Sequence, residues 1–217
     1  MREQYTKQLQ QLHEAMLHMG ELCCQVIELA IQALTNWDKA LIIKEQEIDA
    51  EIDKMEREIE SRCLQLLLKQ QPVAGDLRDI SAALKMISDM ERIGDQATDI
   101  AEIAAFLQGS LDLQKTDLAR MAREAIRMVQ LSIAAFVDRD PEIAGKVIAY
   151  DDVVDRFFAQ IKSELITLIA AHPEQGEACL DLLMVAKYLE RIGDHATNIA
   201  EWVEYSVLGK RSKDGVM

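Results

Sequence analysis

A twelve-residue segment that occurs twice constrains the fold of this chain more than any other feature of its sequence. Residues 91–102 read ERIGDQATDIAE and residues 190–201 read ERIGDHATNIAE, so ten of the twelve positions are identical at a distance of 99 residues. Apolar residues recur every three or four positions in both copies, which is the period of an amphipathic helix. A repeat of this kind predicts a fold built from two similar helical units.

The composition favours helices and argues against several classes of partner. Of the 217 residues, 49% are hydrophobic, 5% are aromatic and only three are proline, a balance typical of a globular helical protein. The net charge of −14 disfavours nucleic acid, because phosphate binding requires clustered Lys and Arg. No stretch stays apolar over the ~18 residues that a membrane span needs, and the first residues lack the apolar core of a signal peptide. We therefore expect a cytoplasmic protein without membrane insertion.

The spacing of apolar residues predicts three long helices in the first half of the chain. The first covers about residues 3–36, where Leu, Met, Val, Cys and Ala fall alternately three and four positions apart. A break near Trp37 separates it from a second helix, and a turn at Pro72 and Gly75 separates the second from a third. The third helix is expected to end before Gly109.

The second half of the chain repeats this arrangement. Asp49 and Asp53 correspond to Asp151 and Asp155 at a distance of 102 residues, and the distance falls to 99 at the repeated segment, so the second hairpin is three residues shorter. Its turn falls at residues 172–177. The sequence thus predicts an all-α protein with two tandem, pseudo-symmetric three-helix bundles, at residues 1–109 and 110–209, and a flexible tail at 210–217.

Acidic residues form a stripe along each copy of the repeated segment. On a helix, Glu91, Asp95 and Asp99 point to one side, away from the centre of the apolar seam. An outward acidic face is common on amphipathic helices, so a solvated surface is the simplest interpretation. Such faces usually mix Lys with Glu, however, because like charges four residues apart repel by ~0.2–0.5 kcal/mol. An unmixed stripe that occurs twice favours a role in binding cations.

A second acidic row lies opposite each stripe. Residues of an antiparallel hairpin that are equally far from its turn lie at the same height, and this rule places Asp53 beside Asp95 and Asp49 beside Asp99. The corresponding pairs of the second hairpin are Asp155 with Asp194 and Asp151 with Asn198. Helices packed ~8–10 Å apart leave a groove that carboxylates from both sides can span. Such oxygen ligands suit hard metal ions.

Taken together, these motifs resemble those of a known family. The two copies of Glu-Arg-Ile-Gly-Asp, the aspartate row one helix earlier, and Gln71-Pro72-x-x-x-Asp76-Leu77-Arg78 are similar to the PhoU family of phosphate-uptake regulators over essentially the whole chain. The resemblance implies a homodimer of two-bundle subunits without catalytic activity. It also implies negative regulation of phosphate uptake and phosphate-starvation signalling, through an adaptor that links the ATPase subunit of the phosphate ABC transporter to a sensor histidine kinase.

The resemblance further implies metal clusters on the acidic motifs. Divalent or ferric ions, in mononuclear or multinuclear sites, are expected, with iron, magnesium, manganese, calcium and zinc as candidates. Carried over by position, the ligands are Asp49, Asp53, Glu91, Asp95 and Asp99 in the first site and Asp151, Asp155, Glu190, Asp194 and Asn198 in the second. The second site carries less charge, because Asn198 is neutral and because Val147 and Phe158 stand where the first repeat has Glu45 and Glu56. We therefore expect the first site to bind metal more tightly.

Two other functions are compatible with an acidic helical bundle. A carboxylate-bridged di-iron enzyme or iron-storage protein uses Glu-x-x-His motifs on the inner faces of its helices. None of the four histidines here has a glutamate three residues before it. A structural coiled-coil module with solvated acidic faces is the third alternative, and it would bind no metal after dialysis. His195 follows Asp194 and could ligate a metal, but Gln96 occupies this position in the first repeat, so we treat the histidine as incidental.

Overall fold

The protein is helical along nearly all of its described length. The structure is a computed structural model that describes residues 2–36, 38–70, 74–107 and 116–210, and these residues contain no strand. Their helices are α1 (Arg2–Asn36), α2 (Lys39–Gln70), α3 (Ala74–Phe106), α4 (Leu118–Asp138), α5 (Pro141–Ala171), the short 3-10 helix η2 (Pro173–Gln175) and α6 (Gly176–Leu208). The all-α prediction is confirmed. The predicted breaks at Trp37, Pro72 and Gly109 lie outside the described residues.

The ends of the last two long helices follow from the residues that stand there. Asp140 caps α5, because its carboxylate accepts hydrogen bonds from the backbone N–H groups of Glu142 and Ile143. Pro141 occupies the first turn, where its missing N–H group costs nothing. Gly209 ends α6 with a φ of 76°, a left-handed conformation that favours glycine.

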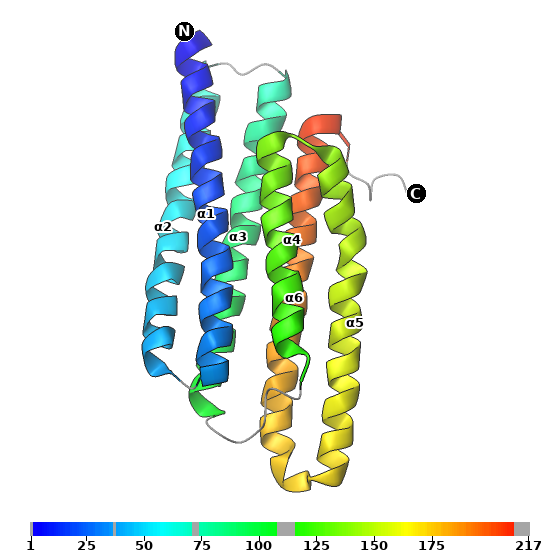
Figure 1. The fold of residues 1–217 in the computed structure, drawn as a ribbon. Helices are drawn as coiled ribbons and strands as arrows, with labels where there is room; N and C mark the ends of the chain where they lie inside the picture. Colours follow the sequence, from blue (N-terminus) through cyan, green and yellow to red (C-terminus); the bar gives the residue numbers. More distant parts are fainter. Residues whose placement is uncertain (1, 37, 71–73, 108–115, 211–217) are drawn as a thin grey trace.

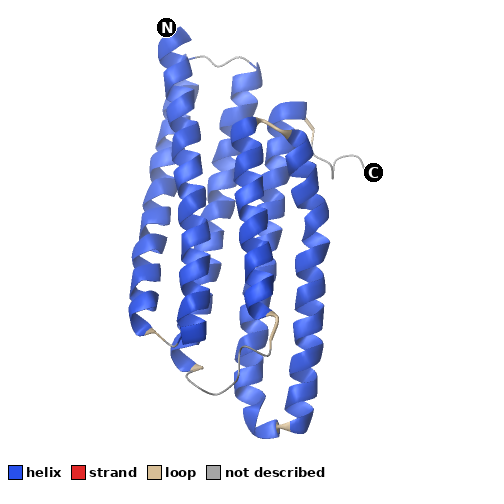
Figure 2. Ribbon diagram, viewed as in Figure 1, coloured by secondary structure: helices blue, strands red, loops and turns tan. Residues whose placement is uncertain are grey.

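The long helices form two three-helix units that lie side by side (Figures 1 and 2). Helices α1, α2 and α3 pack against one another, as do α4, α5 and α6. The two units meet mainly along α3 and α6, and α1 also contacts α4. Helix α2 ends and α3 begins at the end of the molecule where α1 begins, whereas α5 ends and α6 begins at the opposite end (Figure 1). The two units are therefore related by an approximate twofold axis across the α3–α6 contact.

The predicted apolar seams form the hydrophobic core. Met16, Met19, Met86, Met90 and Ile93 are fully buried, and so are most of their neighbours along the same seams. All four cysteines are buried free thiols. No helix among the described residues is long and apolar enough to cross a membrane. Because the seams fill the interior, the acidic stripes are left in the grooves between helices of the same hairpin.

Candidate metal centre

The first acidic stripe lies along the groove between α2 and α3. Burial and the nearby carboxylate of Asp53 raise the pKa of Asp95 above its ordinary value. Burial, Asp53 and Asp95 do the same to the pKa of Asp49, and burial, Asp95 and Glu56 raise the pKa of Glu91. The approach of Asp49 to Gly94 and the hydrogen bond from Thr98 to Glu45 place the two acidic rows opposite each other, and these pKa effects agree with that placement.

Gly94 of α3 leaves space for Asp49, which belongs to the acidic row on α2, to approach the backbone of α3. An ideal Cβ atom at Gly94 would lie 2.5 Å from Oδ1 of Asp49, closer than any real Cβ contact. A larger residue would therefore displace this carboxylate, which accounts for a glycine in a helix interior despite its cost of about 1 kcal/mol relative to alanine. The equivalent Cβ at Gly193 would lie 3.7 Å from Oδ1 of Asp151 and 3.4 Å from Val154, so the second groove is less tight.

Glu45 is a buried carboxylate at one end of the first stripe. Its Oε1 atom accepts a hydrogen bond of 2.9 Å from the Thr98 hydroxyl, while Oε2 is buried without a partner among the described residues. Burial raises the pKa of Glu45 to about 7, the Thr98 hydroxyl opposes this rise, and the charges of Asp49 and Glu102 add to it. A buried carboxylate oxygen without a donor is unfavourable, and either a proton or a cation relieves it.

The second acidic stripe lies between α5 and α6. Burial, Asp194 and Asp155 raise the pKa of Asp151. Burial and Glu190 likewise raise the pKa of Asp194, but the ammonium group of Lys187 lowers it. The second hairpin therefore also brings its carboxylates together, and it adds a positive charge.

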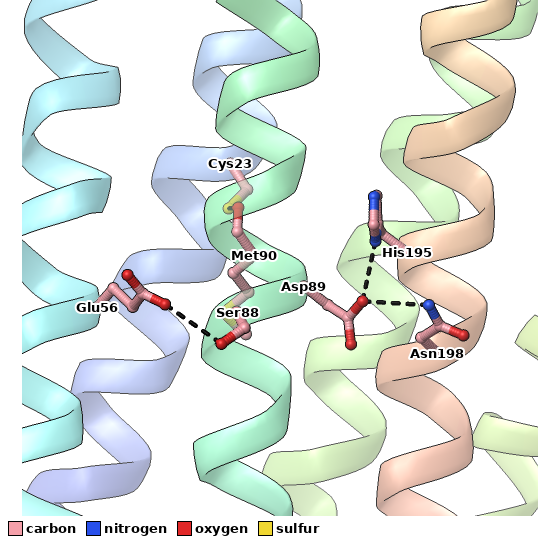
Figure 3. A network of polar contacts seen from close by, with 7 residues as sticks. All are labelled: Cys23, Glu56, Ser88, Asp89, Met90, His195 and Asn198. Atoms are coloured by element: carbon pink, nitrogen blue, oxygen red, sulfur yellow. Dashed lines mark hydrogen bonds and ion pairs between the residues drawn. The ribbon is translucent and has the colours of Figure 1, made fainter.

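The repeats carry different residues at the positions of Lys187 and Phe158. The Lys187 ammonium forms an ion pair with Glu190 and lies 5.4 Å from the centre of the Phe158 ring. Ser88 and Glu56 hold these positions in the first repeat, where the Ser88 hydroxyl donates a hydrogen bond of 3.3 Å to Oε1 of Glu56 (Figure 3). No periodicity in the sequence distinguishes Lys187 from an ordinary surface lysine, and sequence reasoning missed it.

Asn198 makes its contact across the interface between the units. Its amide nitrogen donates a hydrogen bond of 3.1 Å to Oδ1 of Asp89, and Nδ1 of His195 lies 2.9 Å from the same oxygen (Figure 3). His195 and Asp89 are only 13% and 15% exposed, so the imidazole takes part in the contact between the units. In the equivalent contact of the first repeat, the hydroxyl of Tyr188 donates to the carboxylate of Asp99.

The first stripe fits a hard metal ion better than the second. Among the described residues, no three His, Cys, Asp or Glu side chains are gathered closely enough to hold an ion as they stand. The first groove nevertheless supplies opposed carboxylates, the orphaned buried oxygen of Glu45 and the close approach at Gly94. In the second groove, Asn198 has its amide nitrogen committed to Asp89, and Lys187 already neutralises part of the charge.

Comparison with known proteins agrees with the repeat and the fold. The PhoU domain matches residues 16–104 and again residues 118–203. The chain belongs to the PhoU family. It is 35% identical over 209 residues to the phosphate-specific transport system accessory protein PhoU homolog of Pseudomonas aeruginosa, which covers 95% of this chain and 86% of that protein. The homolog of Clostridium acetobutylicum is 35% identical over 216 residues, which covers 97% of each chain.

A solved PhoU structure matches the whole arrangement of helices. The crystal structure of PhoU from Pseudomonas aeruginosa aligns with a TM-score of 0.89 and 35% identity, and the alignment covers 95% of this chain and 100% of that one. The expected PhoU resemblance, with two helical repeats, is thereby confirmed.

Proposed function

We propose that this protein is a negative regulator of phosphate uptake and phosphate-starvation signalling. In this proposal it is an adaptor without catalytic turnover, which contacts the ATPase subunit of the phosphate ABC transporter and a sensor histidine kinase. The observation that carries the regulatory part is the double PhoU match over both repeats, because the PhoU relatives are named as accessory proteins of the phosphate-specific transport system. The net charge of −14 and the long exposed helical faces suit partners with complementary basic surfaces.

The proposal includes a metal ion in the first acidic stripe. Asp49 and Asp53 from α2 and Glu91, Asp95 and Asp99 from α3 would hold it, since carboxylate oxygens are the ligands that hard cations prefer. The ion would supply positive charge to a groove whose carboxylates repel one another. Elemental analysis of protein purified without chelator or affinity metal tests this part, and a metal-free protein would contradict it.

A deletion strain tests the regulatory role. Phosphate-starvation genes should become derepressed while phosphate is plentiful, and the wild-type gene supplied in trans should restore repression. Transcript levels of these genes provide the measurement. Unchanged expression in the deletion strain would contradict the regulatory proposal.

Binding assays test the adaptor role separately. Purified protein should retain the ATPase subunit and the cytoplasmic part of the kinase in pull-down experiments, with an unrelated acidic helical protein as the control. Loss of both interactions would refute the adaptor role and leave the regulatory role standing. Light scattering on the same preparation tests the expected homodimer.

A further inference from the structure

We propose that Lys187 provides an internal cation for the second acidic stripe, so that this stripe is partly neutralised by the chain itself and takes up no divalent metal. The inference rests on the proposed metal binding of the first stripe and explains why the second differs. Its basis is the placement of one ammonium group between α5 and α6.

The contacts of Lys187 place its charge beside the second stripe, on a side chain that is itself 44% exposed. The ammonium group pairs with Glu190, whose side chain is only 16% exposed. It also lies 5.4 Å from the centre of the Phe158 ring on the opposite helix. Its charge reaches Asp194, the next carboxylate of the stripe. Lys187 thus interacts with both carboxylates that α6 contributes to the second site and with the helix across the groove.

The matching positions of the first repeat show what the lysine replaces. Ser88 stands at the position of Lys187, and Glu56 stands at the position of Phe158. Their hydrogen bond of 3.3 Å brings no positive charge to the groove. Over the corresponding positions, the first stripe has seven carboxylates, which are Glu45, Asp49, Asp53, Glu56, Glu91, Asp95 and Asp99, whereas the second has four, which are Asp151, Asp155, Glu190 and Asp194, together with Lys187.

Two features separate this pair from an ordinary ion pair on a helix surface. Exposed pairs three or four residues apart contribute little, because solvent screens them and both side chains lose entropy. Here Glu190 is mostly buried, and the Phe158 ring holds the ammonium from the other side by a cation–π contact. A metal ion entering the second stripe would have to displace this ammonium group, whereas the ion pair of the first stripe, Arg57 with Asp53 at 3.6 Å, joins side chains that are 65% and 46% exposed.

Reciprocal exchanges in the full-length protein test the proposal, with Mn²⁺ as the probe. Lys187→Ser should create an additional Mn²⁺ site per chain in calorimetric titration, and adding Asp194→Asn to it should abolish that site. Ser88→Lys should weaken Mn²⁺ binding to the first stripe at least tenfold. Lys7→Ser, which removes an exposed lysine of α1, makes the same change in net charge and should leave binding unaltered.

Each outcome separates this inference from the function proposed above. A Lys187→Ser protein that is folded by circular dichroism and gains no Mn²⁺ site overturns the role of Lys187, whatever the wild type binds. A wild type without bound Mn²⁺, together with a Lys187→Ser protein that binds it, supports Lys187 and contradicts the metal site of the first stripe. If the serine variant is unstable, Lys187→Met keeps a long side chain over Phe158 and should give the same gain; failure of the methionine variant to gain the additional Mn²⁺ site then overturns the inference.

Discussion

The two three-helix units share a helical frame and differ where polar side chains of neighbouring helices meet. The Ser88–Glu56 hydrogen bond of one unit is replaced in the other by Lys187 above Phe158. Thr98 donates to Glu45 in the first unit, and Thr197 and Val147 stand at the corresponding positions of the second. In the first case both contacting residues differ and in the second only the carboxylate does, while the arrangement of the helices is retained.

This difference teaches that the core and the grooves are specified separately. The buried seams of both units consist of aliphatic residues and methionines with the same period, and these fix the helices. The grooves lie outside these seams, so a carboxylate can be exchanged for an aromatic ring or a lysine without a change of fold. The two units therefore share one architecture although their acidic stripes differ in charge.

Removing one matched carboxylate from each stripe is expected to give the largest contrast. Asp95→Asn should lose most of the bound metal, because Asp95 faces Asp53 in the stripe that has the larger number of carboxylates. Asp194→Asn should lose little. Metal content after identical dialysis is the measurement, with circular dichroism to verify the helices. Equal losses, or a larger loss from the Asp194 change, would contradict the ranking of the two sites.

The buried glutamate of the first unit predicts a pH effect of up to about 3 kcal/mol. Glu45 has a pKa of about 7 in the folded protein and an ordinary value of 4.5, and each pKa unit is worth about 1.4 kcal/mol. The folded state therefore holds a proton more tightly than the unfolded state. Metal-free protein should become more stable as the pH falls from above 7 towards 4.5, where the gain is complete.

Urea unfolding at pH 5 and pH 8 in the presence of a chelator measures this effect. Glu45→Gln keeps an acceptor for the Thr98 hydroxyl and should abolish the contribution of this residue. The difference between wild type and variant isolates Glu45 from the other carboxylates. An identical pH dependence in both proteins would contradict the prediction.

Exchanging Asn198 or Asp99, which lie at the contact between the units, should have a smaller effect on stability. Only the change at Asn198 should destabilise the protein. Asn198→Asp places a carboxylate against Oδ1 of Asp89 and removes the hydrogen bond of 3.1 Å, so a loss of about 1–2 kcal/mol in unfolding free energy is expected. Asp99→Asn keeps an acceptor oxygen for the Tyr188 hydroxyl and should change stability by less than ~0.5 kcal/mol. Urea unfolding in chelator compares the two variants, and a similar loss in both would argue against the opposed roles of these positions.

The two helix glycines should give the smallest contrast. Gly193→Ala meets Val154 at an ordinary contact distance of 3.4 Å and should stabilise the protein by up to about 1 kcal/mol through helix propensity. Gly94→Ala must displace the Asp49 carboxylate, so it should gain less stability and should also weaken Mn²⁺ binding. Thermal unfolding and calorimetric titration measure the two effects. Equal gains with unaltered Mn²⁺ affinity would show that the close approach at Gly94 has no consequence.

Much of the fold and part of the candidate site could be predicted from the sequence. The seam containing Met86, Met90 and Ile93 has the helical period and is buried as expected. The register of Asp53 against Asp95 could also be predicted, because the two helices are joined by a short turn and heights can be counted from it. The role of these carboxylates as metal ligands stays a prediction.

The contacts between the units could not be predicted in the same way. Asp89 and Asn198 belong to helices that no single turn connects, so counting along the chain does not fix their relative height. For the same reason, His195 gave no signal beyond its difference from Gln96. Lys187 has an acidic neighbour three residues later, as many surface lysines do, and only the position of the Phe158 ring reveals its special surroundings.

The approximate twofold axis across α3 and α6 relates contacts that are made by different residues. Two identical single-unit chains would meet through an isologous interface, in which every contact occurs twice with the same residues. Here Asp89 faces Asn198 on one side of the axis, while Tyr188 faces Asp99 at the equivalent place on the other. Because both halves belong to one chain, the different contact residues on the two sides of the axis always occur together. The pairing of the halves also does not depend on protein concentration. A tandem architecture can thus place two acidic stripes of different charge side by side in one molecule.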